Sequence, residues 1–146
     1  MARRTFGDTS GFYSLLVKKD SMHNKASGLL SGAARTKDLF VTTDYVLDET
    51  ATLLKARGYM HLLPKFFDAV FSSKACNLEW MDPSRFANTR SLFLKQGDHA
   101  WSFTDCFSFV VMNLKGLLLD ADLQPALLQH ARLKVNFEHP EANSSH

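Results

Sequence analysis

The sequence contains little cysteine. Among its 146 residues only Cys76 and Cys106 occur, far apart, and they form neither a CxxC pair nor a disulfide framework. Such sparse use is typical of proteins in a reducing compartment, so we expect a cytoplasmic protein. The six histidines show no spacing that suits metal ligands, and we expect His99 on the surface. The sequence therefore argues against a disulfide-stabilised protein and against a zinc-binding protein.

Long apolar runs and a strong net charge are also missing. No stretch approaches the roughly 18 apolar residues that a membrane-spanning helix needs. The start, MARRTFGDTS, has two arginines but no apolar segment behind them, so we expect neither a signal peptide nor membrane association. The formal net charge of +2 is too small to predict nucleic-acid binding by itself. With 45% hydrophobic and 22% charged residues, the composition predicts one ordinary globular domain.

Short strand-like runs alternate with longer helical patterns, which favours the α/β class with a mainly parallel sheet. The segments expected as strands are 3–6, 39–43, 76–81 and 134–137. The helical patterns fall in 7–19, 23–37, 44–58, 60–73, 82–97, 101–115 and 117–133. We place one domain at 1–138 and expect the polar segment 139–146 to be a disordered tail. Gly7 stands where a β-branched residue would suit a buried strand better, and we expect it to cost strand stability without touching the chemistry.

One carboxylate stands at the start of an almost wholly apolar helix. In WSFTDCFSF, residues 101–109, Asp105 precedes a run in which only Ser108 and Asn113 are polar. A helix that is apolar on all sides is a buried helix. Ser102 and Asp105 also match the capping box, which places the acid at the positive end of the helix dipole. Taken alone, the segment predicts a capping role for Asp105.

Asp8 directly follows the first expected strand, where Asp8, Thr9 or Ser10 can equally cap the next helix. In parallel sheets, ligands bind beyond the carboxyl ends of the strands, so Asp8 and the helix that begins near Asp105 can meet at one edge. Carboxylates gathered there raise one another's pKa unless a cation neutralises them. Hard oxygen ligands suit Mg²⁺ or Mn²⁺ better than zinc. Such ions can activate water to hydrolyse a phosphodiester.

Glu49 is a third acid with a distinctive position. It lies on the helix after the second expected strand, at the edge of the inward-facing stripe, so we expect it to reach the interior rim. Its neighbours Asp44 and Asp48 are expected on the surface. The alternative for Glu49 is an ordinary ion pair with Lys55 or Arg57, or a side chain that extends to water.

Three segments resemble the PIN-domain ribonucleases, specifically the VapC-type toxins of bacterial toxin–antitoxin pairs. They are FGDTSGFYSLL (6–16), VTTDYVLDETATLL (41–54) and WSFTDCFSFVVM (101–112), and with their order and spacing the resemblance covers residues 4–116. It implies a PIN-like three-layer α/β/α fold with a mainly parallel central sheet, here a PIN domain over 1–138. It also implies hydrolysis of single-stranded regions of RNA, a homodimer, and inhibition by a small antitoxin that inserts into the active-site groove.

By the same resemblance, Asp8, Glu49 and Asp105 match the family's catalytic, metal-binding acids. Thr9 and Thr104 are the neighbours that position them, and the implied cofactor is Mg²⁺ or Mn²⁺. The basic residues whose charge suits the RNA backbone are Arg3, Arg4, Lys18, Lys19 and Lys37.

The chain departs from the family pattern after Gly116. The family's fourth acid falls on Gln124, and Asp122 is the substitute that we name as a further metal ligand, with Asp120 more distant. The site then binds its metal with Asp122 as the fourth acid, or it binds the metal more weakly with three acids. Otherwise the protein is a degenerate PIN module that binds RNA or a partner protein. A frameshifted C-terminal segment would give the same pattern.

Overall fold

The computed structural model describes residues 4–98 and 100–116. Several predictions concern other positions and lie outside the described residues. They are those made for Arg3, His99, the helix 117–133 with Asp120, Asp122 and Gln124, the strand 134–137, the domain end at 138 and the tail 139–146.

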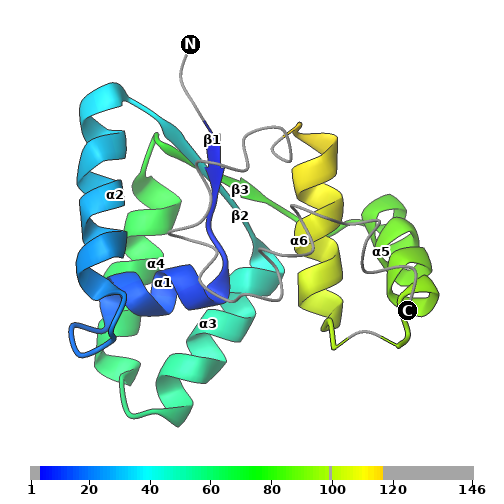
Figure 1. Cartoon of the computed structure of the whole chain (residues 1–146), viewed down its shortest axis with the longest axis horizontal. Helices are drawn as coiled ribbons and strands as arrows, with labels where there is room; N and C mark the ends of the chain where they lie inside the picture. Colours follow the sequence, from blue (N-terminus) through cyan, green and yellow to red (C-terminus); the bar gives the residue numbers. More distant parts are fainter. Residues whose placement is uncertain (1–3, 99, 117–146) are drawn as a thin grey trace.

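Three parallel strands form the described sheet. β1 (Arg4–Phe6), β2 (Leu39–Thr43) and β3 (Cys76–Glu79) are hydrogen-bonded in the order β1-β2-β3 (Figure 1). β2 ends in the β-branched residues Val-Thr-Thr, whose stiff side chains suit a pleated backbone. Because both pairs are parallel, the carboxyl ends of the strands meet at one edge of the sheet. The predicted α/β class with a parallel sheet is confirmed.

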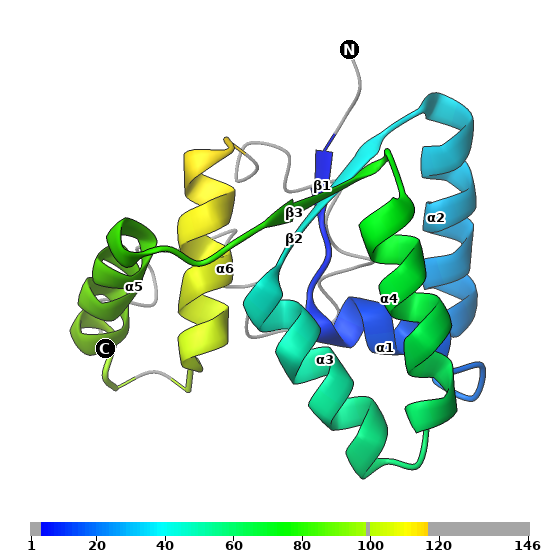
Figure 2. The ribbon, with the colours of Figure 1, turned by 180° about the vertical axis from the view of Figure 1, so that it is seen from behind.

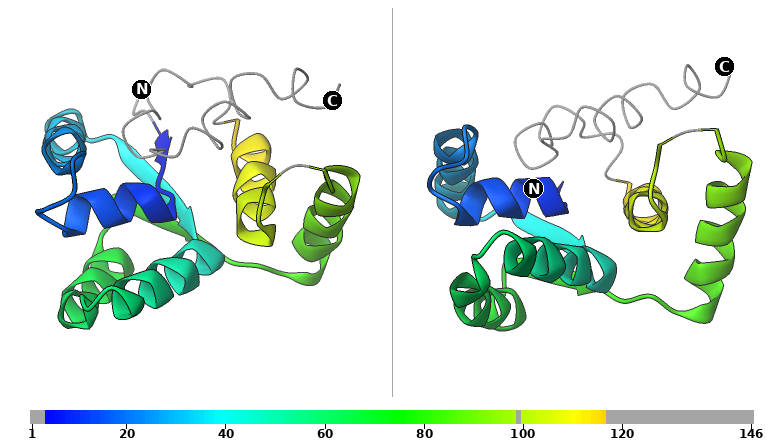
Figure 3. Two further views of the ribbon diagram at one scale, coloured as in Figure 1. Left: turned by 60° about the horizontal axis from the view of Figure 1, so that its bottom comes forward. Right: turned by 90° about the horizontal axis from the view of Figure 1, so that it is seen from below.

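Helices cover both faces of this sheet. One layer holds α1 (Thr9–Leu16) and α2 (His23–Thr36), and the opposite layer holds α3 (Asp44–Ala56) and α4 (Leu63–Ser72) (Figure 3). This is the expected three-layer arrangement. No helix within the described ranges is long and apolar enough to cross a membrane.

The segment predicted as one helix over 60–73 is divided. It begins as a 3-10 helix, η1 (Met60–Leu62), and α4 starts at Leu63 with Pro64 in its first turn. Proline has no N–H to donate to the carbonyl four residues earlier, so Pro64 cannot continue an α-helix from Met60 but can begin a new one.

α6 (Phe103–Leu114) stands beside the sheet, and α5 (Pro83–Lys95) lies outside α6 (Figure 1 and Figure 2). α6 packs on α5 on one side and on α3 on the other, where the rings of Tyr45 and Phe107 have centroids 5.3 Å apart. Phe107 and Met112 are fully buried. The expectation that the apolar helix is buried is confirmed, and this packing fixes the direction in which its N-terminus points.

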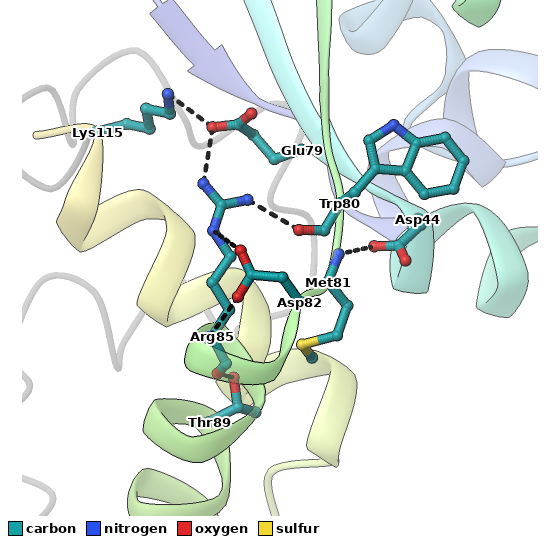
Figure 4. A network of polar contacts seen from close by, with 8 residues as sticks. All are labelled: Asp44, Glu79, Trp80, Met81, Asp82, Arg85, Thr89 and Lys115. Atoms are coloured by element: carbon teal, nitrogen blue, oxygen red, sulfur yellow. Dashed lines mark hydrogen bonds and ion pairs between the residues drawn. The ribbon is translucent and has the colours of Figure 1, made fainter.

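A polar network joins β3 to α5 and α6 (Figure 4). The carboxylate of Glu79, the last residue of β3, pairs with Arg85 at 3.3 Å and with Lys115 at 2.7 Å. Arg85 also donates to the carbonyl of Trp80 at 3.0 Å. Because only 13% of the Glu79 side chain is exposed, removing its partners would leave a poorly solvated charge. The network therefore holds the two outer helices to the end of β3.

Asp44 is not the surface acid that we expected. Its side chain is half-buried, and Oδ1 accepts the N–H of Met81 at 3.0 Å, which joins the start of α3 to the segment after β3 (Figure 4). Asp44 and Met81 are 37 residues apart, so no local pattern could reveal the contact. Asp48 is exposed, as expected.

Gly7 is explained by packing. A methyl group there would lie 2.6 Å from Cζ of Phe12, whose ring meets Phe66 edge-on with centroids 5.1 Å apart. The Gly7 N–H donates to Val41 and its carbonyl accepts from Thr42, both at 2.8 Å, so the backbone cannot retreat without losing hydrogen bonds. The expectation that a β-branched residue would fit better is wrong, because Phe12 fills that space.

We expect Gly7→Ala to lower the free energy of unfolding by about 1–3 kcal/mol through the clash with Phe12. Gly28→Ala is the matched control. Gly28 lies in α2 with open space beside its α-carbon, so alanine there should raise stability by about 0.5–1 kcal/mol. Urea unfolding of both variants measures the effects, and shifts of the same sign would contradict this account.

Partial burial opposes ionisation of Glu79, but the pairs with Lys115 and Arg85 outweigh it and lower the pKa of Glu79 below its ordinary 4.5. Such a carboxyl stabilises the fold above its unfolded pKa and loses that contribution as the pH falls through the folded pKa. We expect Glu79→Gln to cost about 1–2 kcal/mol near neutral pH. The deficit in urea unfolding should shrink well below pH 4.5, whereas a pH-independent deficit would argue against the network.

Candidate active site

Asp8 is positioned by the turn between β1 and α1. It is the N-cap of α1, where Oδ1 accepts the N–H of Gly11 at 2.9 Å. The hydroxyl of Ser10 donates to its two oxygens at 3.2 and 3.1 Å. Only 3% of Asp8 is exposed. The capping role predicted from local sequence is present, and the same hydrogen bonds fix the orientation of the carboxylate.

Asp105 is positioned by the first turn of α6. Its N–H donates to Oγ of Ser102 at 3.0 Å, and the N–H of Ser102 donates back to Oδ2 of Asp105 at 3.0 Å. The predicted capping box is therefore confirmed. Asp105 is as buried as Asp8, with 3% exposed. A surface cap would not need such burial.

Glu49 comes from the middle of α3, two turns before its C-terminus. It is half-buried, next to the buried Thr50 and one turn after the buried Val46, as its place at the edge of the inward stripe predicted. Within the described part of the chain it forms no ion pair with Lys55 or Arg57. The ordinary ion pair considered for Glu49 is thus not formed.

The three acids line one pocket of about 220 Å³ at the carboxyl edge of the sheet. Side chains from α1, α3 and α6 complete its wall. They are Thr9, Ser10, Val46, Leu53, Arg57, Thr104 and Ser108. Residues that are remote in sequence therefore come together where the parallel-sheet argument placed them.

Thr9 and Thr104, the two threonines implied by the family resemblance, both line this pocket. Oγ1 of Thr9 is buried and has no hydrogen-bond partner among the described residues. Sequence reasoning overlooked Ser108 and Arg57 as lining residues. Helical spacing could have identified them, since Ser108 follows Asp105 by three residues and Arg57 follows Glu49 by eight.

The basic residues suggested for RNA contact lie elsewhere. Of those that the structure describes, Arg4, Lys18, Lys19 and Lys37 are exposed, and none lines the pocket. Their contact with RNA stays a prediction.

Burial and mutual repulsion weaken the acidity of Asp8. Removal from water raises the pKa of Asp8 from 3.8 to about 7. The hydrogen bonds from Gly11 and Ser10 act in the opposite direction, and the charges of Asp105 and Glu49 add to the rise. The pocket thus concentrates negative charge that a bound cation would neutralise.

The side chains around the pocket suit a hard divalent cation. Carboxylate and hydroxyl oxygens are ligands of Mg²⁺ and Mn²⁺, and the buried hydroxyl of Thr9 lacks a protein partner in the described ranges. No three His, Cys, Asp or Glu side chains in these ranges lie close enough to hold one ion directly. Mg²⁺ usually keeps several of its waters, so one or two direct carboxylates can suffice. Metal binding by Asp8, Glu49 and Asp105 stays a prediction.

Comparison with solved structures relates the chain to a toxin. It is similar to VapC20 of Mycobacterium tuberculosis, a sarcin-ricin loop cleaving toxin, with a TM-score of 0.68 and 28% sequence identity. The match covers 77% of this chain and 83% of that chain. No protein-family model and no curated protein sequence matched. The resemblance to VapC-type PIN-domain toxins, and the fold that it implies, are confirmed.

We expect Asp8→Asn to stabilise the metal-free protein by about 2–4 kcal/mol near pH 8, because asparagine caps a helix as well as aspartate but carries no charge to desolvate. With its pKa raised, folded Asp8 binds more protons than unfolded Asp8 between pH 3.8 and about 7. Wild-type stability should therefore fall as the pH rises through that window, and the gain of the variant should vanish below it.

Urea unfolding in the presence of a chelator, across that pH window, measures the effect. Asp48→Asn is the control, since Asp48 is exposed and should show no such dependence. Equal stability of wild type and Asp8→Asn near pH 8 would rule out a buried, charged Asp8.

Proposed function

From its VapC-type PIN fold, we propose that this chain is an endoribonuclease toxin that hydrolyses RNA phosphodiester bonds with Mg²⁺ or Mn²⁺. The observation that carries the proposal is the shared pocket of Asp8, Glu49 and Asp105, in which two of the acids are only 3% exposed. Buried carboxylates that repel one another are costly for the fold, and a metal-dependent reaction accounts for their retention. Similarity to VapC20, a sarcin-ricin loop cleaving toxin, supports RNA as the substrate.

In the proposed mechanism, the pocket of Asp8, Glu49 and Asp105 would hold the ion through one or two direct carboxylates and through the waters that the ion keeps. Asp122 is the proposed additional ligand. When bound, the ion would supply positive charge that makes water more acidic and offsets the negative charge of the phosphate. The remaining chemistry belongs to the protein. Gly11 and Ser10 hold the Asp8 carboxylate in one orientation, so little reorganisation accompanies the reaction.

The rest of the pocket positions the RNA phosphate. The hydroxyls of Thr104 and Ser108 lie on α6 near Asp105 and can donate to phosphate oxygens. Val46 and Leu53 form the apolar part of the wall and limit the access of bulk water. No side chain is required as the nucleophile.

We also propose a cytoplasmic location, a homodimer, and inhibition by a small cognate antitoxin, all of which rest on the likeness to VapC-type toxins. A short reading frame that overlaps the start of this gene would support the antitoxin. Reading the DNA beyond the Gly116 codon would show whether a shifted frame restores the usual family ending.

A second candidate function is a weak PIN module that binds RNA or a partner protein without cutting RNA. Two observations favour it. Gln124 stands at the position of the fourth acid, and no three-ligand metal cluster is formed within the described ranges. Calorimetric titration with Mn²⁺ separates the candidates. Binding that disappears in Asp8→Ala supports the enzyme, and no binding by the wild type supports the module.

We expect Asp105→Asn and Glu49→Gln each to slow RNA cleavage by about 100-fold or more, because each removes a charge that holds the ion. Asp48→Asn is the matched control on α3. It removes the neighbouring but exposed carboxylate and should stay within about twofold of the wild type. The assay follows cleavage of a structured RNA with Mg²⁺, with Mn²⁺ and with a chelator. Undiminished cleavage by Asp105→Asn would refute the site, and undiminished cleavage in chelator would refute the metal.

A further inference from the structure

A second pocket adjoins the carboxylate pocket. It has a volume of about 240 Å³, and Ser10, Leu53 and Arg57 line both pockets. The side chains that line only the second pocket are Tyr13, Ser14, Asp20, Ser21 and Met22. A chain-like ligand bound at the three acids can therefore continue into the second pocket past Arg57.

Arg57 is the one basic residue among the described residues that line these pockets. Its guanidinium lies over the ring of Tyr13, with Cζ 4.9 Å from the ring centroid, and Tyr13 in turn meets the ring of Tyr59 edge-on at 6.2 Å. This stacking restricts an otherwise exposed side chain. The guanidinium is thus held, before any ligand arrives, at the passage between the pockets.

The position of Arg57 on α3 sets its distance from the acids. Glu49, Leu53 and Arg57 follow one another at intervals of four, so they share one face of the helix. Eight residues of α-helix rise by about 12 Å between α-carbons, but the long side chain of Arg57 still lines the same pocket as the three acids. If the phosphate to be cut lies at the acids, an adjacent phosphate reaches the guanidinium.

The second pocket suits an uncharged, hydrogen-bonding group better than a phosphate. Its hydroxyls come from Tyr13 and from the serines at 10, 14 and 21, and Asp20 adds a carboxylate that would repel an anion. Oδ2 of Asp20 accepts the N–H of Met22 at 3.1 Å, so this acid also shapes the wall. A ribose or a base offers the donors and acceptors that such a wall can satisfy.

We propose that Arg57 binds the phosphate next to the one that is cut, and that the second pocket receives the adjoining nucleoside. Arg57 is then a positioning residue, and the substrate is a single strand that extends at least one nucleotide beyond the cleaved bond. This inference rests on the proposed function, because it takes the three acids as the place of cleavage. The proposed contact is specific, because one guanidinium binds one phosphate. General attraction of RNA by surface lysines would involve no single phosphate.

The test compares Arg57→Gln with Lys55→Gln, which removes an equal charge from an exposed position of the same helix that lines neither pocket. The substrate is a single-stranded RNA oligonucleotide cut at one mapped site. Arg57→Gln should raise KM by about 10–100-fold with kcat within about twofold, the range for loss of one charge-assisted contact. Arg57→Lys should recover part of the loss, and Lys55→Gln should match the wild type.

Modified substrates identify the phosphate and the nucleoside. A neutral methylphosphonate at the adjacent phosphate should raise KM for the wild type and abolish the difference between wild type and Arg57→Gln, as a double-mutant cycle requires. An abasic residue at the adjoining nucleotide should raise KM for both proteins. A difference that persists with the methylphosphonate would overturn the role of Arg57, and an abasic substrate cut normally would overturn the second pocket.

Failure of this inference can be told apart from failure of the proposed function. If Arg57→Gln and Lys55→Gln both behave as wild type while Asp105→Asn is inactive, the proposed function stands and the role of Arg57 is refuted. If the wild type cuts no RNA with either metal, the proposed function fails. Fluorescence anisotropy with the same oligonucleotide then decides whether Arg57→Gln still weakens RNA binding relative to Lys55→Gln.

Discussion

The burial of the Asp8 carboxylate beside two other acids has an energetic cost that the surrounding structure must offset. Burial and the charges of Asp105 and Glu49 raise its pKa to about 7, so ionised Asp8 opposes folding at neutral pH. Gly11 and Ser10 offset part of this cost through their hydrogen bonds. The rest must come from the packed core around it, which explains why the acids stand on well-buried elements and not on surface loops.

Two of the acids cap helices and also line the pocket. A capping carboxylate is fixed by backbone amides, which are among the most rigid groups of a protein. Asp8 at α1 and Asp105 at α6 are held in this way, and they still contribute to the pocket wall. Capping and the proposed catalytic role are therefore not competing explanations for these residues. At the edge where three elements meet, the capping hydrogen bonds fix the orientation of the two carboxylates.

The sequence revealed the features that depend on local pattern. Asp8 and Asp105 could be placed from capping motifs and from the convergence of parallel strands, and Glu49 from its position on a helical wheel. Features that depend on distant contacts could not be read in the same way. The space beside Gly7 is filled by Phe12, and Asp44 binds an amide 37 residues away. Helical spacing could place Arg57 on the same face as Glu49, but its stacking on Tyr13 depends on the packing of α1 against α3.

The pocket combines two parts of the fold that are held in place in different ways. Asp8 and Glu49 follow β1 and β2, which are joined by a hydrogen-bonded ladder, whereas Asp105 arrives on a helix held by α3, α5 and the side chains around Glu79. Phe107 and Met112 of α6 are nevertheless buried in the same core as Phe6 of β1 and Val41 of β2, so all three acids depend on one core. A ligand that contacts acids from both parts therefore stabilises the folded chain as a whole, because it binds only where the strands and α6 are both in place.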